Sequence, residues 1–95
     1  MSRDESPPGQ AFRDASARLR AVLDASTDLL PASVLDDLRE LVHYNESVIA
    51  LENLCSHLHD DDVIVPADTV RAIRELAAAL KVALGPWFEA IRTTP

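Results

Sequence analysis

The chain has 95 residues, a length that predicts one domain with one modest hydrophobic core, and its formal net charge is −7. Hydrophobic residues make up 47% of it but aromatic residues only 4%, and glycine occurs twice, a composition that predicts an all-α fold. The negative charge and the scattered basic residues argue against binding to nucleic acid. The first ten residues are polar and Pro-rich, and no apolar run reaches the roughly 20 residues of a membrane span, so we expect a cytoplasmic protein.

Two amphipathic helices are expected in the first half of a single helical domain spanning residues 1–95. Residues 1–9 are expected to form a flexible tail, and residues 11–25 the first helix. Pro31 is suited to the first turn of a second helix that ends near His43. Helical spacing places one apolar face on each helix, consisting of Phe12, Ala15, Leu19, Val22 and Leu23 on the first and of Val34, Leu35, Leu38, Leu41 and Val42 on the second.

The segment "HYNESVIALENLC", residues 43–55, predicts the start of a third helix that runs to about Leu58. Asn45 is a favoured N-cap residue, and Glu46 places negative charge in the first turn. Ile49 is an apolar residue on the polar side of this helix. The buried face is expected to contain Val48, Leu51, Leu54, Cys55 and Leu58.

Three consecutive acidic residues, 60–62, are expected to end the third helix, after which the short apolar segment 63–65 tucks into the core. Pro66 precedes a largely apolar fourth helix, for which Gly85 is the expected C′ residue. Short loops favour antiparallel neighbours, so we expect a small antiparallel bundle of four helices plus a short C-terminal helical turn. In that turn, one end of the core would be capped by Trp87, Phe88 and Ile91.

The sequence offers weak candidates for metal binding and catalysis. His57 and His59 diverge by about 200° on a helix, so they could share a metal ion only where the helix has ended. Cys55 could meet His59 one turn away, but its place in the apolar stripe favours a buried and unreactive thiol. Phosphate-binding glycine loops are absent. We therefore expect no enzyme activity, and predict no catalytic, cofactor-binding or metal-binding residue.

Charge is distributed unevenly along the chain. Between Asp24 and Asp68 there are eleven acidic residues and a single basic one, Arg39. This pattern suits either a solvated surface or a docking surface for a basic protein, on which an exposed Ile49 would supply apolar contact unless the N-terminal tail covers it. The candidate partner-binding residues are Asp36, Glu40, Tyr44, Glu46, Ile49, Asn53, Asp60, Asp61 and Asp62.

Residues 43–66, "HYNESVIALENLCSHLHDDDVIVP", resemble the central segment of the MafI-type immunity proteins, small acidic helical proteins encoded beside bacterial polymorphic or contact-dependent toxins. The similarity lies in Asn45-Glu46, in "ALENLC" at 50–55, and in Leu58 with the acidic turn after it, and it extends loosely over residues 31–91. It implies that the chain binds and neutralises a cognate toxin C-terminal domain, commonly a nuclease, and nucleases tend to be basic because their substrate is polyanionic. Like-charge repulsion across the dense acidic patch disfavours a homodimer through it, so we expect a monomer in a 1:1 complex. The resemblance carries over no toxin-contacting residue. The alternative is a non-enzymatic helical adaptor or regulatory module.

Overall fold

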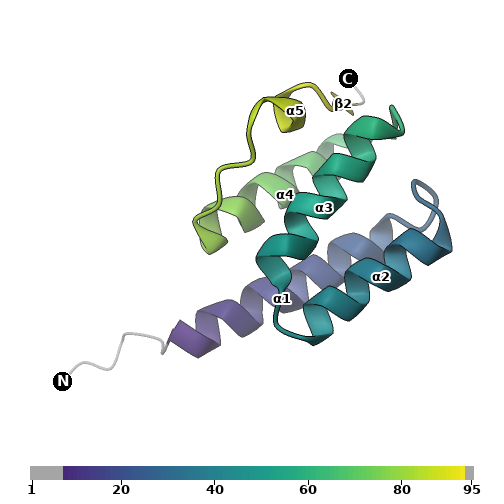
Figure 1. Ribbon diagram of the computed structural model, residues 1–95. Helices are drawn as coiled ribbons and strands as arrows, with labels where there is room; N and C mark the ends of the chain where they lie inside the picture. Colours follow the sequence, from purple (N-terminus) through teal and green to yellow (C-terminus); the bar gives the residue numbers. More distant parts are fainter. Residues whose placement is uncertain (1–7, 94–95) are drawn as a thin grey trace.

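The computed structural model describes the backbone of residues 8–93 and the side chains of residues 13–85 and 88–93 (Figure 1). The predicted all-α class is confirmed: the chain forms α1 (Pro8–Ala25), α2 (Ala32–His43), α3 (Ser47–Asp60), α4 (Ala67–Leu80) and the short α5 (Pro86–Glu89). Residues 8 and 9 of the predicted tail belong to α1, while residues 1–7 lie outside the described residues, as do the side chains of Phe12 and Trp87.

The four longer helices share one core. Figure 1 shows α1 flanked by α2 and α4, with α3 in front, and α3 contacts each of the other helices. Because every helix turns an apolar stripe toward its neighbours, the predicted faces of α1 and α2 are buried or half-buried where they are described. The buried side chains of the helices are Ala15, Leu19, Val22, Leu23, Leu35, Leu38, Val42, Ala50, Leu51, Leu54, Cys55, Leu58, Ile73, Leu76, Ala77 and Phe88.

The buried face of α3 is rotated relative to the prediction. Val48 is only half-buried, whereas Ser47 and Ala50 are fully buried. Small side chains are accommodated there because α3 contacts α1 on that side, where the hydroxyl oxygens of Ser16 and Ser47 lie 2.7 Å apart in a buried hydrogen bond. Ile49 is 43% exposed, as its position on the helix predicted.

The prediction that Asn45 caps the N-terminus of α3 is wrong. Asn45 has a φ of 64°, and it closes α2: its N–H donates to the carbonyl of Val42 at 3.1 Å, and the N–H of Glu46 donates to that of Leu41 at 2.8 Å. This is a Schellman motif, which needs a left-handed residue after the helix, and asparagine tolerates that conformation. The same residue type thus ended one helix instead of starting the next. Glu46 occupies the N-cap position of α3 and makes no side-chain cap hydrogen bond.

The prediction that α4 continues to Gly85 is also wrong. Lys81 takes a φ of 59°, and the N–H of Val82 donates to the carbonyl of Ala77 at 2.8 Å, which ends the helix at Leu80. Leaving the helix here lets the following segment return to the core, where Leu84 is 8% exposed. Gly85, with a φ of 81°, then turns the chain into α5.

Two short strands bring the segment before α4 next to the segment after α5. β1 (Ile64–Val65) pairs in parallel with β2 (Arg92–Thr93), with Ile64 opposite Arg92. Val65 is fully buried, as expected for the apolar segment, but Ile64 is 54% exposed. Phe88 of α5 is buried and Ile91 packs against the core.

Candidate interaction surface

Three large apolar side chains are exposed in the acidic part of the chain: Ile64, at 54%, follows the acidic turn, and the other two flank the start of α3. Tyr44 is 65% exposed and Ile49 is 43% exposed, and the ring of Tyr44 meets that of His43 edge-on at 5.0 Å. Tyr44 stands at the C-cap of α2, Ile49 lies in the first turn of α3, and Asn53 follows one turn later on the exposed side. All three predicted residues are exposed, and Ile49 and Asn53, four residues apart, lie on one side of α3.

A shallow groove continues this side of α3 toward its C-terminus. It has a volume of about 550 Å³ and is lined by Glu52, Asn53, Ser56, His59 and Asp60. The hydroxyl of Ser56 donates to one carboxylate oxygen of Asp60 at 3.5 Å, and Nδ1 of His59 lies 3.4 Å from the other. Only Asn53 and Asp60 were predicted. The helical spacing 49, 53, 56 and 60 is the signal that would have added Ser56.

The acidic residues on α2 form a separate group. Arg39 donates from Nη2 to Asp24 at 2.9 Å and from Nη1 to Asp36 at 3.5 Å, so this base binds acids of α1 and α2. Asp36 therefore shares its basic partner with an acidic residue of α1. Glu40 is exposed one turn further along α2. The structure does not show Asp36 and Glu40 joined to the predicted residues of α3.

The acidic turn after α3 is partly neutralised from within the chain. Asp62, whose φ is 54°, binds Nε of Arg92 through its carboxylate at 3.2 Å. Asp61 and Glu46 are exposed and have no ion-pair partner among the described residues. Of the three turn acids, Asp61 is thus the freest to meet a partner.

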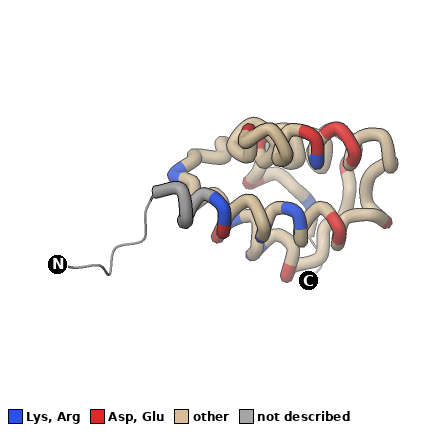
Figure 2. The backbone as a smooth tube through the Cα atoms, turned by 90° about the horizontal axis from the view of Figure 1, so that it is seen from below, with Lys and Arg blue, Asp and Glu red and all other residues tan. Residues whose placement is uncertain are grey.

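The charges are divided unevenly among the segments of the chain. Residues 26–66 carry nine acidic residues and one basic one, whereas α1 and α4 together carry five basic and four acidic residues. In Figure 2, red positions predominate at the end of the molecule away from the N-terminus.

Cys55, one of the weak catalytic candidates, has a buried thiol. Cys55 is fully buried, and burial, followed by the charge of Glu52, raises the pKa of its thiol to about 12. A thiol with this pKa is protonated near neutral pH and is a poor nucleophile. Within residues 8–93, no three His, Cys, Asp or Glu side chains are grouped so that they could hold a metal ion. Among the same residues, no helix is both long and apolar enough to cross a membrane.

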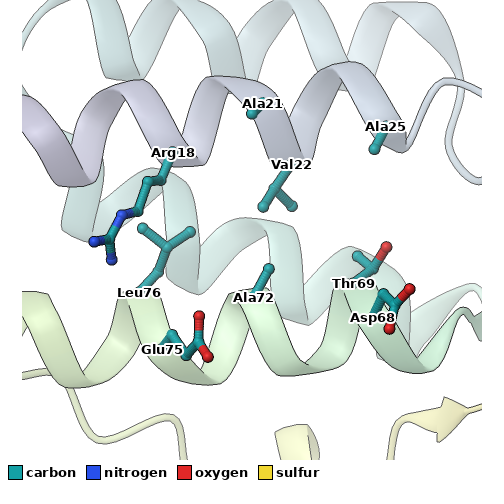
Figure 3. Close-up of a pocket in the computed structure, with 9 residues that line it drawn as sticks. All are labelled: Arg18, Ala21, Val22, Ala25, Asp68, Thr69, Ala72, Glu75 and Leu76. Atoms are coloured by element: carbon teal, nitrogen blue, oxygen red, sulfur yellow. The ribbon is translucent and has the colours of Figure 1, made fainter.

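A second groove lies between α1 and α4, and the sequence did not point to it. It has a volume of about 340 Å³, and Figure 3 shows its two helical walls with alanine side chains between them. The nine lining residues are Arg18, Ala21, Val22, Ala25, Asp68, Thr69, Ala72, Glu75 and Leu76. None of the predicted partner-binding residues lines it.

Comparison of the chain with protein-family models, with curated proteins and with solved structures gave no match. A functional assignment therefore rests on the surface described above and on the resemblance of residues 43–66.

Proposed function

We propose that this protein is an immunity protein that binds and neutralises a bacterial toxin domain through its α2–α3 side, by which we mean the exposed residues of α2, the turn 44–46, α3 and the turn 61–62. The single observation that carries the proposal is the exposure of Tyr44 and Ile49 within the part of the chain that holds nine acidic residues and one basic one. The resemblance of residues 43–66 to MafI-type immunity proteins supplies the class of partner. In this proposal the chain is a small antiparallel bundle that acts in the cytoplasm of a bacterium with a polymorphic or contact-dependent toxin system.

Apolar and charged residues have different parts in such a complex. Desolvation of an exposed apolar side chain at the centre of an interface contributes affinity, whereas surrounding charges act mainly on the association rate and on partner choice. Ile49 is the apolar anchor in this proposal. Glu46 precedes it by three residues, and the shallow groove lined by Asn53 and Asp60 follows it along α3. The exposed strip of α3 from Ile49 to Asp60 is about 16 Å long, at about 1.5 Å per helical residue.

The chemistry of this strip suits a basic toxin domain, in particular a nuclease. A nuclease binds a polyanionic substrate and tends to carry basic residues near its site. Carboxylates of the α2–α3 side could occupy the place of phosphates, or the chain could bind beside the site and exclude substrate sterically. Both routes use one chain for each toxin domain, and neither needs a cofactor or enzyme activity.

The experiment is a calorimetric titration of the full chain into the C-terminal domain of the large secreted protein encoded next to it, at low and high salt. We expect binding that weakens with salt. Ile49→Asp should raise Kd by at least about tenfold, because it puts a charge in the apolar contact. Ile64→Asp is the matched control, since Ile64 is also exposed but lies on β1.

Charge reversal tests the acidic side separately. Glu40→Lys should slow association and flatten its salt dependence, whereas Glu75→Lys, the same change on α4, should have a smaller effect. If the neighbouring domain does not bind, the immunity function is rejected in favour of a helical adaptor. If the domain binds but Ile49→Asp and Ile64→Asp weaken the complex equally, Ile49 is not the apolar centre of the interface.

A further inference from the structure

The groove between α1 and α4 has the spacing of a helix-packing seam. Its walls present Arg18, Val22 and Ala25 from α1, and Thr69, Ala72 and Leu76 from α4, at intervals of three and four residues. This interval keeps a stripe of side chains on one face of a helix and is the interval by which helices pack in bundles.

The walls of this seam are made mainly of small side chains. Ala21 and Ala25 are exposed and Ala72 is half-buried, while Val22 and Leu76 close the floor. Alanine lets a neighbouring helix approach closely. Since α3 contacts α1 and α4 from the other side, no described helix covers the seam.

Opposite charges stand on opposite walls at one end of the groove. Figure 3 shows Arg18 of α1 and Glu75 of α4 at this end, with Ala25 facing Asp68 and Thr69 at the other. Neither Arg18 nor Glu75 has an ion-pair partner among the described residues, whereas Asp68 already binds Arg71 at 3.4 Å. Because the basic residue of the α1 wall and the acidic residue of the α4 wall lie at the same level, the α1 wall of one copy of the chain is complementary to the α4 wall of another.

We propose that this groove is the interface of a weak homodimer, with a second copy of the chain as its occupant. A two-fold axis parallel to the groove sets α1 of each copy against α4 of the other without changing the level of any residue. Arg18 then faces Glu75 of the second copy at two symmetric places, as in an isologous interface. The alanines of the four helices meet further along the groove from these pairs.

The overall negative charge does not oppose this dimer at the contact itself. The charge of α1 and α4 is nearly balanced, while the acidic excess lies in residues 26–66. Like-charge repulsion between two copies arises mainly from the acidic residues of α2, α3 and their turns, none of which lines this groove. The dimer leaves Tyr44 and Ile49 exposed, so it stands independently of the proposed function and is compatible with one toxin domain per chain.

The test is sedimentation of the full chain from about 10 μM to about 1 mM, a range chosen because a seam two helical turns long gives a weak contact. We expect a concentration-dependent shift toward the mass of a dimer. Arg18→Glu should raise the dimer Kd by about tenfold, since it creates two like-charge pairs. Arg20→Glu is the matched control, because Arg20 is an exposed arginine of α1 outside the groove.

A charge swap completes the design. Arg18→Glu with Glu75→Arg should restore dimerisation to within about threefold, because the two walls remain complementary. Ala21→Glu should abolish the dimer while Ala17→Glu, also on an exposed part of α1, should not. Thermal melting of each variant checks that the monomer stays folded.

The proposal is overturned if the chain sediments as a monomer throughout, if Arg20→Glu weakens the dimer as much as Arg18→Glu, or if the charge swap fails to restore it. A monomer whose Ala21→Cys thiol reacts slowly would assign the groove to another segment of the same chain. A monomer whose Ala21→Cys thiol is protected only by the toxin domain would assign it to that partner. Either outcome rejects the second copy as occupant.

Discussion

The α2–α3 side and the α1–α4 side of the molecule differ in both their charges and their exposed apolar groups. On the first, large exposed side chains, Tyr44 and Ile49, belong to a strongly acidic part of the chain. On the second, alanines line a groove whose charges are nearly balanced. Large anchors within charge of one sign suit a different, oppositely charged partner, whereas small residues between complementary charges suit helix packing.

The two sides nevertheless rest on the same core. Leu54 of α3, Leu19 of α1 and Ile73 of α4 are all fully buried, so the difference is one of surface chemistry and not of separate folding units. The lesson is that surface substitutions should act on one side only, while core substitutions should act on both.

The largest effect should come from Leu54→Ala, which would break both sides together. Leu54 is fully buried, and its truncation leaves a cavity that costs about 2–5 kcal/mol of unfolding free energy. Urea denaturation followed by circular dichroism measures it, with Ile49→Ala as the exposed control on the same helix. An equal loss of stability in the two variants would mean that Ile49 belongs to the core.

The hydroxyl pair that joins α1 to α3 comes next. Ser47→Ala leaves the buried hydroxyl of Ser16 without its 2.7 Å partner and should cost about 1–3 kcal/mol. The double variant with Ser16→Ala should be more stable than the sum of the two single changes, because no unpaired hydroxyl remains. Ser56→Ala, in the α3 groove, should cost less than about 0.5 kcal/mol. Strict additivity would remove the link between the two sides.

Cys55 predicts a pH dependence of stability. Its folded pKa is raised from 9.0 to about 12, so its stabilising contribution is complete below pH 9.0 and is lost as the pH rises toward 12. The reason is that the exposed thiol of the unfolded chain ionises first. Stability measured from about pH 8 to about pH 10.5 should fall more steeply for the native chain than for Cys55→Ala. Parallel pH profiles would contradict the buried, protonated thiol.

The smallest effect should distinguish the two sides by their surface charge. Arg39→Ala removes the base that binds Asp24 and Asp36, and Arg71→Ala removes the partner of Asp68. Each pair is exposed and contributes less than about 1 kcal/mol. At low salt we expect Arg39→Ala to lower the unfolding free energy more than Arg71→Ala does, because Arg39 is the basic residue of an acidic surface. The difference should vanish at about 0.5 M salt, where these charges are screened. Equal costs at low salt would weaken the contrast between the sides.

Helical periodicity determined where the helices lie and which residues form most of their buried faces. Leu19 and Leu23 on α1, and Leu51 and Leu58 on α3, were placed correctly because a period of 3.6 residues fixes their common direction before any neighbour is known. The exposure of Ile49 followed from the same geometry. Composition alone determined the fold class.

Tertiary structure decided where the helices end and which residues at the edge of a buried face are covered. Asn45 suits either an N-cap or a left-handed C′ position, and the return of α3 along α2 selected the second. Lys81 took a left-handed conformation because the segment after α4 had to bring Leu84 back to the core. Val48 lost its predicted burial because α3 turns its small Ser47 and Ala50 toward its neighbours.

The candidate surfaces show the same division. The sequence by itself determined that residues 26–66 are acidic and that Ile49 is exposed among them, since both follow from composition and helical period. Only the tertiary structure joined Arg39 to Asp24 across two helices and set Arg18 and Glu75 on facing walls of one groove. These pairs bring together residues 15 or more positions apart, and the helical period carries no information about which helices become neighbours.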